Sequence, residues 1–339
     1  MGRCGFDQLQ GREIEHRDRG LVLASRDGGR RWQRLPSGTD QRLAAVHCAR
    51  RQHCVAVGLN GTVRFGSDDG RPWRRGRNGG DAALSDVFCT TMADCVAVGS
   101  GGTVLLSDDG GRRWRRIPVD TQHPLNAVYC PGRWRCLAVG SHGLLLVSDD
   151  GGERWRPQPS GSDRRLLALH CEGKRCLASG VAGTLLRSED AGRRWRQADT
   201  GSDQRLLALA CASRARCLAL GGDGVLASDD GGRQWQHFPT GTLAWFNDVA
   251  CPGIANCLLV GEQGRIRISD DGGRRWRPLP VSKTRLPQLG RAHRRKTPEK
   301  LPLIFNSRIK IMEKLGWPAL LPVESIWPSE RMSMRTSQA

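Results

Sequence analysis

One octapeptide recurs through most of the chain and limits what it can fold into more than any other feature. Residues 107–114 read Ser-Asp-Asp-Gly-Gly-Arg-Arg-Trp. Close copies begin at Ser25, Ser148, Ser188, Ser228 and Ser269, and a shortened copy begins at Ser67. Successive copies start 42, 40, 41, 40, 40 and 41 residues apart. A fixed period of about 40 residues built from short strands is typical of a β-propeller, in which each repeat forms one four-stranded blade. We therefore predict an all-β propeller.

Each copy of the octapeptide, which we call a box, has the pattern of a tight turn between two strands. Asp109 can accept hydrogen bonds from turn amides, Gly111 can adopt a positive φ, and Trp114 can fold its indole over the turn. We expect these structural roles at the equivalent aspartates and tryptophans, which are Asp27, Asp69, Asp109, Asp150, Asp190, Asp230 and Asp271, and Trp32, Trp73, Trp114, Trp155, Trp195, Trp235 and Trp276. The alternative is a Ca²⁺ site at Asp108-Asp109, but calcium needs more oxygen ligands than two adjacent carboxylates supply. We expect no metal and no cofactor.

These residues match the Asp-box, or BNR, repeat, and the match covers about residues 21–280. Together with Cys-Leu-Ala-Val-Gly segments such as residues 136–140, the boxes make the chain most similar to the photosystem II stability/assembly factor family and its bacterial relatives. The resemblance implies an extracytoplasmic propeller that holds a membrane-protein assembly intermediate on a basic surface. A non-photosynthetic relative with another client remains an alternative, and sialidases carry the Asp-box too.

The repeats divide the chain into three parts. Residues 20–36 match the second half of a repeat, and six complete repeats open at Leu43, Leu84, Leu125, Leu166, Leu206 and Phe246. Six units plus a half predict seven blades, or six with a spare hairpin. We assign residues 1–19 to no element, residues 20–280 to the propeller, and residues 281–339 to a basic tail that contains proline. For this tail, disorder and a short amphipathic helix over residues 304–315 are the alternatives.

Twelve of the 13 cysteines form one closely spaced pair per complete repeat. The pairs are Cys48 with Cys54, Cys89 with Cys95, Cys130 with Cys136, Cys171 with Cys176, Cys211 with Cys217, and Cys251 with Cys257. Each pair brackets a turn between two apolar strands, where a Cα separation of about 5.5 Å suits a disulfide. Zinc is the alternative, prompted by His47 and His53, but no Cys-x2-Cys occurs. Disulfides imply an oxidising compartment, either periplasmic, lumenal or secreted. Residues 1–20 contain no apolar signal core, so we expect the natural start to lie upstream.

The charge of the chain indicates an acidic partner. Lys and Arg number 53 against 34 Asp and Glu, a net charge of +19, of which +8 lies in residues 281–339 and +11 in the remainder. No apolar run approaches the roughly 20 residues of a membrane helix. The first candidate binding set lies within the boxes, before the tryptophan, and comprises Arg112, Arg113, Arg193, Arg194, Arg274 and Arg275. The second set precedes the first strands of the repeats and comprises Arg42, Arg165, Arg205 and Trp245. Solvated loop charge is the alternative for both sets.

The residues favour a scaffold over an enzyme. A sialidase-like hydrolase would need a tyrosine nucleophile, and Tyr129, the one tyrosine, occupies a position that every repeat contains. We therefore predict no catalytic residue and a monomer that binds an acidic protein or a membrane-protein assembly intermediate. A sialidase-like glycoside hydrolase and a propeller that binds an anionic glycan are the alternatives. Nucleic acid is disfavoured because most tryptophans belong to boxes and cannot stack on bases.

Overall fold

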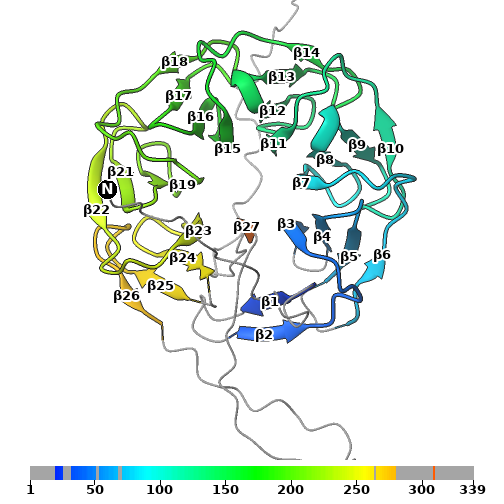
Figure 1. The fold of residues 1–339 in the computed structure, drawn as a ribbon, viewed down its shortest axis with the longest axis horizontal. Coiled ribbons are helices and arrows are strands. Elements are labelled where there is room, and N and C mark those ends of the chain that lie inside the picture. Colours follow the sequence, from blue (N-terminus) through cyan, green and yellow to red (C-terminus); the bar gives the residue numbers. More distant parts are fainter. Residues whose placement is uncertain are drawn as a thin grey trace, which may run out of the picture.

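The chain folds into a ring of antiparallel β-sheets (Figure 1). The computed structural model describes residues 20–25, 32–50, 53–67, 71–262, 265–279 and 308–309. Six sheets each contain four consecutive strands, every strand paired antiparallel with the next. We number these sheets blades 1 to 6. In each blade the first strand faces the centre of the ring and the fourth lies at its rim (Figure 1).

The six blades follow one another along the chain. The strands of blades 1 and 2 are β3 (Leu43–Arg50), β4 (His53–Gly58), β5 (Val63–Gly66), β6 (Arg74–Arg75), β7 (Leu84–Cys89), β8 (Cys95–Gly99), β9 (Val104–Ser107) and β10 (Arg115–Ile117). Those of blades 3 and 4 are β11 (Leu125–Tyr129), β12 (Cys136–Gly140), β13 (Leu145–Ser148), β14 (Arg156–Pro157), β15 (Leu166–Glu172), β16 (Arg175–Gly180), β17 (Leu185–Ser188) and β18 (Arg196–Gln197). Those of blades 5 and 6 are β19 (Ala208–Cys211), β20 (Cys217–Leu220), β21 (Gly224–Ser228), β22 (Gln236–Pro239), β23 (Phe246–Ala250), β24 (Cys257–Gly261), β25 (Ile266–Ser269) and β26 (Arg277–Pro278). Two 3-10 turns, η2 (Ser100–Gly102) and η3 (Ser141–Gly143), join the second and third strands of blades 2 and 3.

The hydrophobic core lies between the blades. Val55 and Val57 of blade 1 pack against Leu84, Val87 and Leu105 of blade 2, and equivalent clusters join each later pair of blades. Because a blade is covered on both faces, its second strand reads as a continuous apolar run, and β8 and β12 are buried throughout. This packing gives the repeat its sequence pattern.

A two-stranded sheet lies between blade 6 and blade 1. It consists of β1 (Val22–Ser25) and β2 (Trp32–Leu35), the half repeat of the sequence. Val22 packs against the cluster of blade 1, and Trp32 packs against that of blade 6. Six complete blades are thus observed, and among the described residues β1 and β2 form a separate two-stranded sheet in the ring.

All six predicted cysteine pairs form disulfides. Each joins the first and second strands of one blade across their connecting turn. The Cα atoms of each pair lie between 3.9 and 4.1 Å apart, closer than the predicted spacing. This separation is nearer to that of non-hydrogen-bonded cross-strand neighbours, which approach more closely than hydrogen-bonded ones.

The disulfide of blade 1 decides between the two interpretations of its cysteines. Cys48 of β3 and Cys54 of β4 lie directly opposite each other, with their Cα atoms 3.9 Å apart, and their sulfur atoms are bonded. Cys54 is buried, at 2% exposure. Zinc binds cysteine as the free thiolate, and the disulfide between Cys48 and Cys54 leaves none, so the zinc alternative at His47 and His53 is wrong.

One short strand from the C-terminal part of the chain lies at the centre of the ring. β27 (Arg308–Ile309) pairs in parallel with β3 and extends the sheet of blade 1 to five strands. The amphipathic helix, one of the two alternatives for residues 304–315, is therefore not formed at these two positions, and the other residues of this segment lie outside the described part of the chain. None of the helices in the described part is long and apolar enough to cross a membrane.

Candidate functional site

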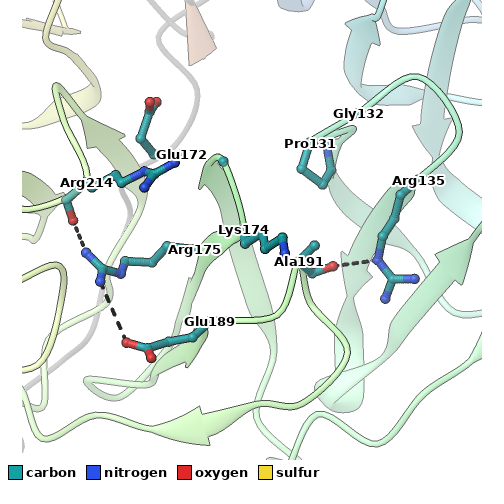
Figure 2. Close-up of a pocket in the computed structure, with 10 residues that line it drawn as sticks. Pro131, Gly132, Arg135, Glu172, Lys174, Arg175, Glu189, Ala191 and Arg214 are labelled. Atoms are coloured by element: carbon teal, nitrogen blue, oxygen red, sulfur yellow. Dashed lines mark hydrogen bonds and ion pairs between the residues drawn. The ribbon is translucent and has the colours of Figure 1, made fainter. Parts of the chain in front are cut away.

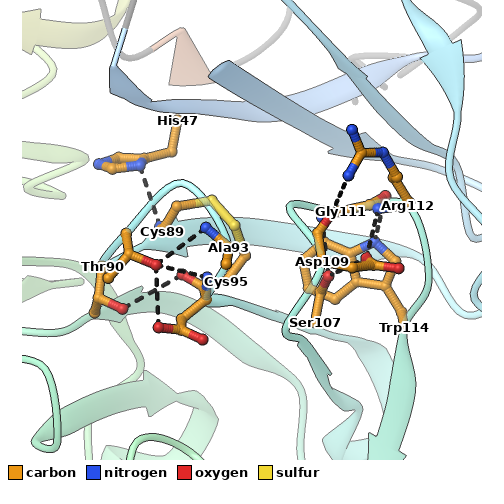
Figure 3. Close-up of a disulfide and its surroundings, with 12 residues drawn as sticks. His47, Cys89, Thr90, Ala93, Cys95, Ser107, Asp109, Gly111, Arg112 and Trp114 are labelled. Atoms are coloured by element: carbon orange, nitrogen blue, oxygen red, sulfur yellow. Dashed lines mark hydrogen bonds between the residues drawn. A yellow bond between two sulfur atoms is a disulfide. The ribbon is translucent and has the colours of Figure 1, made fainter. Parts of the chain in front are cut away.

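The box turn is held together by its own serine, aspartate and tryptophan (Figure 3). The Ser107 hydroxyl donates to Asp109 Oδ1 (3.1 Å) and accepts from the Gly111 amide (2.9 Å). Asp109 Oδ1 also accepts from the amides of Arg112 (3.0 Å) and Arg113 (2.9 Å). The Trp114 indole donates to the Gly111 carbonyl (3.0 Å). The carboxylate is therefore directed at the chain's own backbone.

The same network recurs at the boxes of blades 3 to 6, through Asp150, Asp190, Asp230 and Asp271. Burial alone would raise the pKa of these carboxyls and of Asp109, but the amide N–H groups and the serine hydroxyl outweigh it and hold each pKa below its ordinary value. Within the described residues, no His, Cys, Asp or Glu cluster is arranged to hold a metal ion. Box residues Asp27 and Asp69 lie outside the described part.

The tryptophans of the boxes pack differently from blade to blade. Trp73, Trp114 and Trp276 are buried. Trp73 donates to the Ser67 carbonyl (3.2 Å), whereas the Trp276 indole nitrogen is buried without a hydrogen-bond partner. The indoles that are half-buried are those of Trp32, Trp155, Trp195 and Trp235. The common role of the ring is therefore packing, and its hydrogen bond varies.

The boxes and the disulfide hairpins share one face of the ring, which we call the box face. The Gly110 amide of a box donates to the carbonyl of Ala93 in the hairpin of the same blade (2.9 Å), and Gly151 donates in the same way to Trp134 (2.7 Å). Alternate turns of an antiparallel sheet lie at opposite ends, so the remaining turns form the other face, which we call the crossover face.

The arginines of the first candidate set lie on the box face, and all six are exposed. Arg112 is partly engaged, because its Nη1 donates to the Asp109 carbonyl (3.2 Å). Arg274 pairs with Asp229 of blade 5 (2.7 Å). Arg112 and the other four members, Arg113, Arg193, Arg194 and Arg275, make no ion pair with any described residue. The guanidinium groups of this set without an ion pair therefore lie on blades 2, 4 and 6.

The second candidate set lies on the crossover face. The backbone carbonyls of Arg42, Arg165 and Trp245 accept hydrogen bonds from the turns between second and third strands. Arg165 also donates to the Asn126 side chain (3.1 Å), and the Trp245 side chain is 57% exposed. Arg205 is exposed and belongs to the same group of loops. Because the two sets occupy opposite faces, the structure does not bring them together in one site.

Three arginines that connect the blades were not among the site residues predicted from the sequence. Arg135, Arg175 and Arg216 each precede the second cysteine of a pair. Arg216 is 5% exposed, donates through Nε to the Gly272 carbonyl of the next blade (3.1 Å), and pairs with Asp229. Arg135 donates to the Ala191 carbonyl of the next blade (2.5 Å) and pairs with Asp149 of its own. Their recurrence beside cysteines was the available signal.

Tyr129 belongs to a row of rings on successive first strands of blades 1 to 4. Its ring centroid lies 4.5 Å from that of Phe88 and 5.3 Å from that of His170, and Phe88 lies 4.3 Å from His47. Burial, together with the charge of Glu172, raises the pKa of Tyr129 to about 12. A tyrosine nucleophile requires easier loss of its proton, so this environment argues against such a role.

The architecture places the chain among the β-propellers, and the comparisons with known proteins agree. The solved structure of YCF48 bound to a D1 peptide is similar at a TM-score of 0.63 and 20% identity, over 77% of this chain and 88% of that one. YCF48 from Cyanidioschyzon merolae has a TM-score of 0.57 and 19% identity, over 71% and 86%. An ancestral GH74 enzyme has a TM-score of 0.56 and 15% identity, over 73% of this chain and 37% of that one. At these identities the likeness establishes the fold alone.

No protein-family model and no curated protein matches the chain.

Proposed function

We propose that this chain is a non-enzymatic propeller that binds an acidic protein partner through the arginines of its box face. The observation that carries this proposal is the set of exposed guanidinium groups, Arg113, Arg193 and Arg194 above all, that are free of ion pairs with described residues on a rigid ring. Guanidinium groups held in fixed positions make bidentate hydrogen bonds to carboxylates. The net charge of +19 favours an acidic partner over the whole surface.

Three further features support a role as an assembly or stability factor outside the cytoplasm. The six disulfides indicate an oxidising compartment. The sequence resembles that of photosystem II assembly factors, and the similar YCF48 structure holds a D1 peptide, so we propose a polypeptide partner here too, such as a membrane-protein assembly intermediate. We further propose that residues 20–280 form the binding unit, as a monomer, with β1 and β2 as the outer half of a seventh blade.

The test compares two quadruple variants with the same charge change on opposite faces. The first replaces Arg112, Arg113, Arg193 and Arg194 with Gln. The second replaces Arg42, Arg164, Arg165 and Arg205 with Gln. Partners are captured from a membrane extract with the wild-type protein and identified, and their association and dissociation rates are then measured at low and high salt.

We expect the box-face variant to associate more slowly, with a smaller change in dissociation, because long-range attraction steers encounter. We expect high salt to slow the wild type in the same way, since it shortens the Debye length from about 8 Å at physiological ionic strength. Equal slowing of association by the crossover-face variant would show that binding depends on overall charge. Slower association in the crossover-face variant alone would place the binding site on the crossover face.

A glycoside hydrolase is the second candidate, because a GH74 enzyme shares the fold. The raised pKa of Tyr129 opposes a sialidase-like mechanism. Turnover of a fluorogenic sialoside that disappears in Tyr129→Phe would overturn the scaffold proposal.

A further inference from the structure

A groove of about 630 Å³ crosses the box face over blades 3, 4 and 5 (Figure 2). Its walls come from three successive disulfide hairpins and from the box of blade 4. The lining residues used below are Arg135, Lys174, Arg175, Glu189, Ala191 and Arg214. This volume lies in the range of sites that take up a small ligand or a short peptide segment.

The groove lies over the hairpin of blade 4, which is one residue shorter than the others. Four residues separate Cys171 from Cys176, against five in every other pair. Glu172 at the end of β15 and Arg175 at the start of β16 are opposite each other in the strand register, so Gly173 and Lys174 form the turn. Gly173 has a φ of +62°. The Arg214 side chain of the next hairpin extends over this turn, and its Nη2 lies 3.6 Å from the position that a Cβ on Gly173 would occupy (Figure 2).

The box of blade 4 also departs from the repeat at this groove. Ala191 has a φ of +59° at a position where the other described boxes have Gly110, Gly151, Gly231 and Gly272. A left-handed conformation is unfavourable for a residue with a Cβ, which lies too close to the following carbonyl oxygen. Strained backbone conformations of this kind persist where the surrounding structure holds them in place, and they cluster at functional sites. A shortened hairpin and a strained box in the same blade distinguish it from the other five.

The groove offers positive charge that the protein does not neutralise itself. Lys174 and Arg214 are exposed, and neither forms an ion pair within the described part of the chain. Arg135 Nη2 and Arg175 Nε are buried without a hydrogen-bond partner. Of the two lining carboxylates, Glu189 is occupied by Arg187 and Arg233, whereas Glu172 is exposed and makes no ion pair within the described residues. The donors without partners therefore outnumber the acceptors available to them.

We infer that this groove binds an acidic peptide segment, with side-chain carboxylates on Lys174 and Arg214. The inference rests on the proposed function and assigns its binding subsite to the hairpins of blades 4 and 5. It predicts that the groove recognises shape as well as charge, because the space depends on the missing hairpin residue.

The test measures fluorescence anisotropy of a labelled oligoglutamate peptide, with an oligoglutamine peptide of the same length as the neutral probe. The first variant is Lys174→Gln with Arg214→Gln. Its matched control is Arg74→Gln with Arg75→Gln, two exposed arginines of β6 in blade 1. We expect the groove variant to bind oligoglutamate about tenfold more weakly than the wild type, because two charge-assisted hydrogen bonds are lost. We expect the control to change the affinity less than about threefold, since distant exposed charges are screened.

A second variant inserts Ser after Gly173, which restores the five-residue spacing and leaves the charge unchanged. We expect it to lose affinity as the groove variant does. Thermal melting of each variant verifies folding, and the point variants decide the matter if the insertion does not fold.

The outcomes separate the subsite from the proposed function. Equal losses in the groove variant and its control, or wild-type binding by the folded insertion variant, would overturn the subsite. If oligoglutamate binding is still weakened by replacing Arg112, Arg113, Arg193 and Arg194 with Gln, the proposed function remains supported although the subsite is overturned. A wild-type protein that does not prefer oligoglutamate to oligoglutamine would contradict both.

Discussion

The side chains of the box serine and aspartate form hydrogen bonds with backbone amides of the same turn. Ser107 and Asp109 satisfy three turn amides, and the second glycine, Gly111, brings the turn against the preceding blade. A Cβ on Gly111 would lie 2.9 Å from Val55, and one on Gly192 would lie 2.5 Å from Leu137. The shared chemistry of the boxes therefore serves both the turn and the contact between blades.

We expect Trp114→Ala to destabilise the protein by about 3–5 kcal/mol, because it opens a cavity under a ring that is 7% exposed and removes a hydrogen bond. Urea denaturation measures the change. Trp134→Ala is the matched control, since its ring is 60% exposed and its loss should change stability by less than about 0.5 kcal/mol. Equal effects of the two substitutions would show that the box indole contributes little packing.

Two opposite substitutions at the equivalent position of two boxes, Ala191 and Gly151, measure the energetic cost of backbone strain there. Ala191→Gly should stabilise the protein by about 0.5–1 kcal/mol, because relief of the left-handed conformation exceeds the added freedom of the unfolded chain. Gly151→Ala should destabilise it by a similar amount, and a Cβ there meets nothing closer than 3.6 Å, so clash does not contribute. Paired melting curves of the two variants test the sign, and a stabilising Gly151→Ala would contradict the argument.

At the scale of strands and turns, the blade combines one covalent and one hydrogen-bonded constraint on the same face. The disulfide closes the turn between the first and second strands, and the box closes that between the third and fourth. Hydrogen bonds from box amides to hairpin carbonyls, such as Gly231 to Ala215 (2.7 Å) and Gly272 to Ala255 (2.7 Å), connect the two turns. The two turns of a blade on the box face are thus joined through their backbones.

The lowered pKa values of the five box aspartates predict acid lability. A carboxyl whose pKa is lower in the folded state contributes stability above its unfolded pKa of about 3.9, and loses it as the pH falls through the folded value. We therefore expect the melting temperature to fall steadily below about pH 4. Asp109→Asn should be less stable than the wild type at neutral pH but should show a shallower fall, and an unchanged slope would contradict the assignment.

At the scale of the whole molecule, closure of the ring depends on contacts between residues of neighbouring blades. Arg216 joins the hairpin of blade 5 to the box of blade 6, and Arg135 joins blade 3 to blade 4 in the same way. The two strands β1 and β2 fill the interval between blades 6 and 1 by packing against both. These contacts hold the similar sheets together as a closed ring.

We expect Arg216→Met to cost about 2–3 kcal/mol, because it removes charge-assisted hydrogen bonds from a buried donor and leaves the Gly272 carbonyl unpaired. Arg214→Met, two residues away and exposed, is the matched control and should lie within about 0.5 kcal/mol of the wild type. Urea denaturation gives the energies. Hydrogen exchange should become faster first in blades 5 and 6, and a uniform increase over all blades would contradict a local connection.

Much of the fold follows from the sequence by itself. Each cysteine pair and each box turn depends on residues within a few positions of one another, so the bonds they form can be predicted from a short segment. The recurrence of these segments about every 40 residues then predicts the blades. This locality explains why the six four-stranded blades and the six disulfides could be predicted. It also explains why Asp109 and its equivalents could be assigned to turns.

The tertiary structure alone decided which charges are available to a partner. Arg274 and Arg193 occupy the same position in their boxes, yet Arg274 pairs with Asp229 of the neighbouring blade and Arg193 has no ion pair with a described residue. The burial of Arg216 and the groove over the short hairpin of blade 4 likewise depend on residues about one repeat away. Sequence periodicity makes the blades look equivalent, whereas ion pairs and grooves form between blades, where small departures from the repeat meet in space.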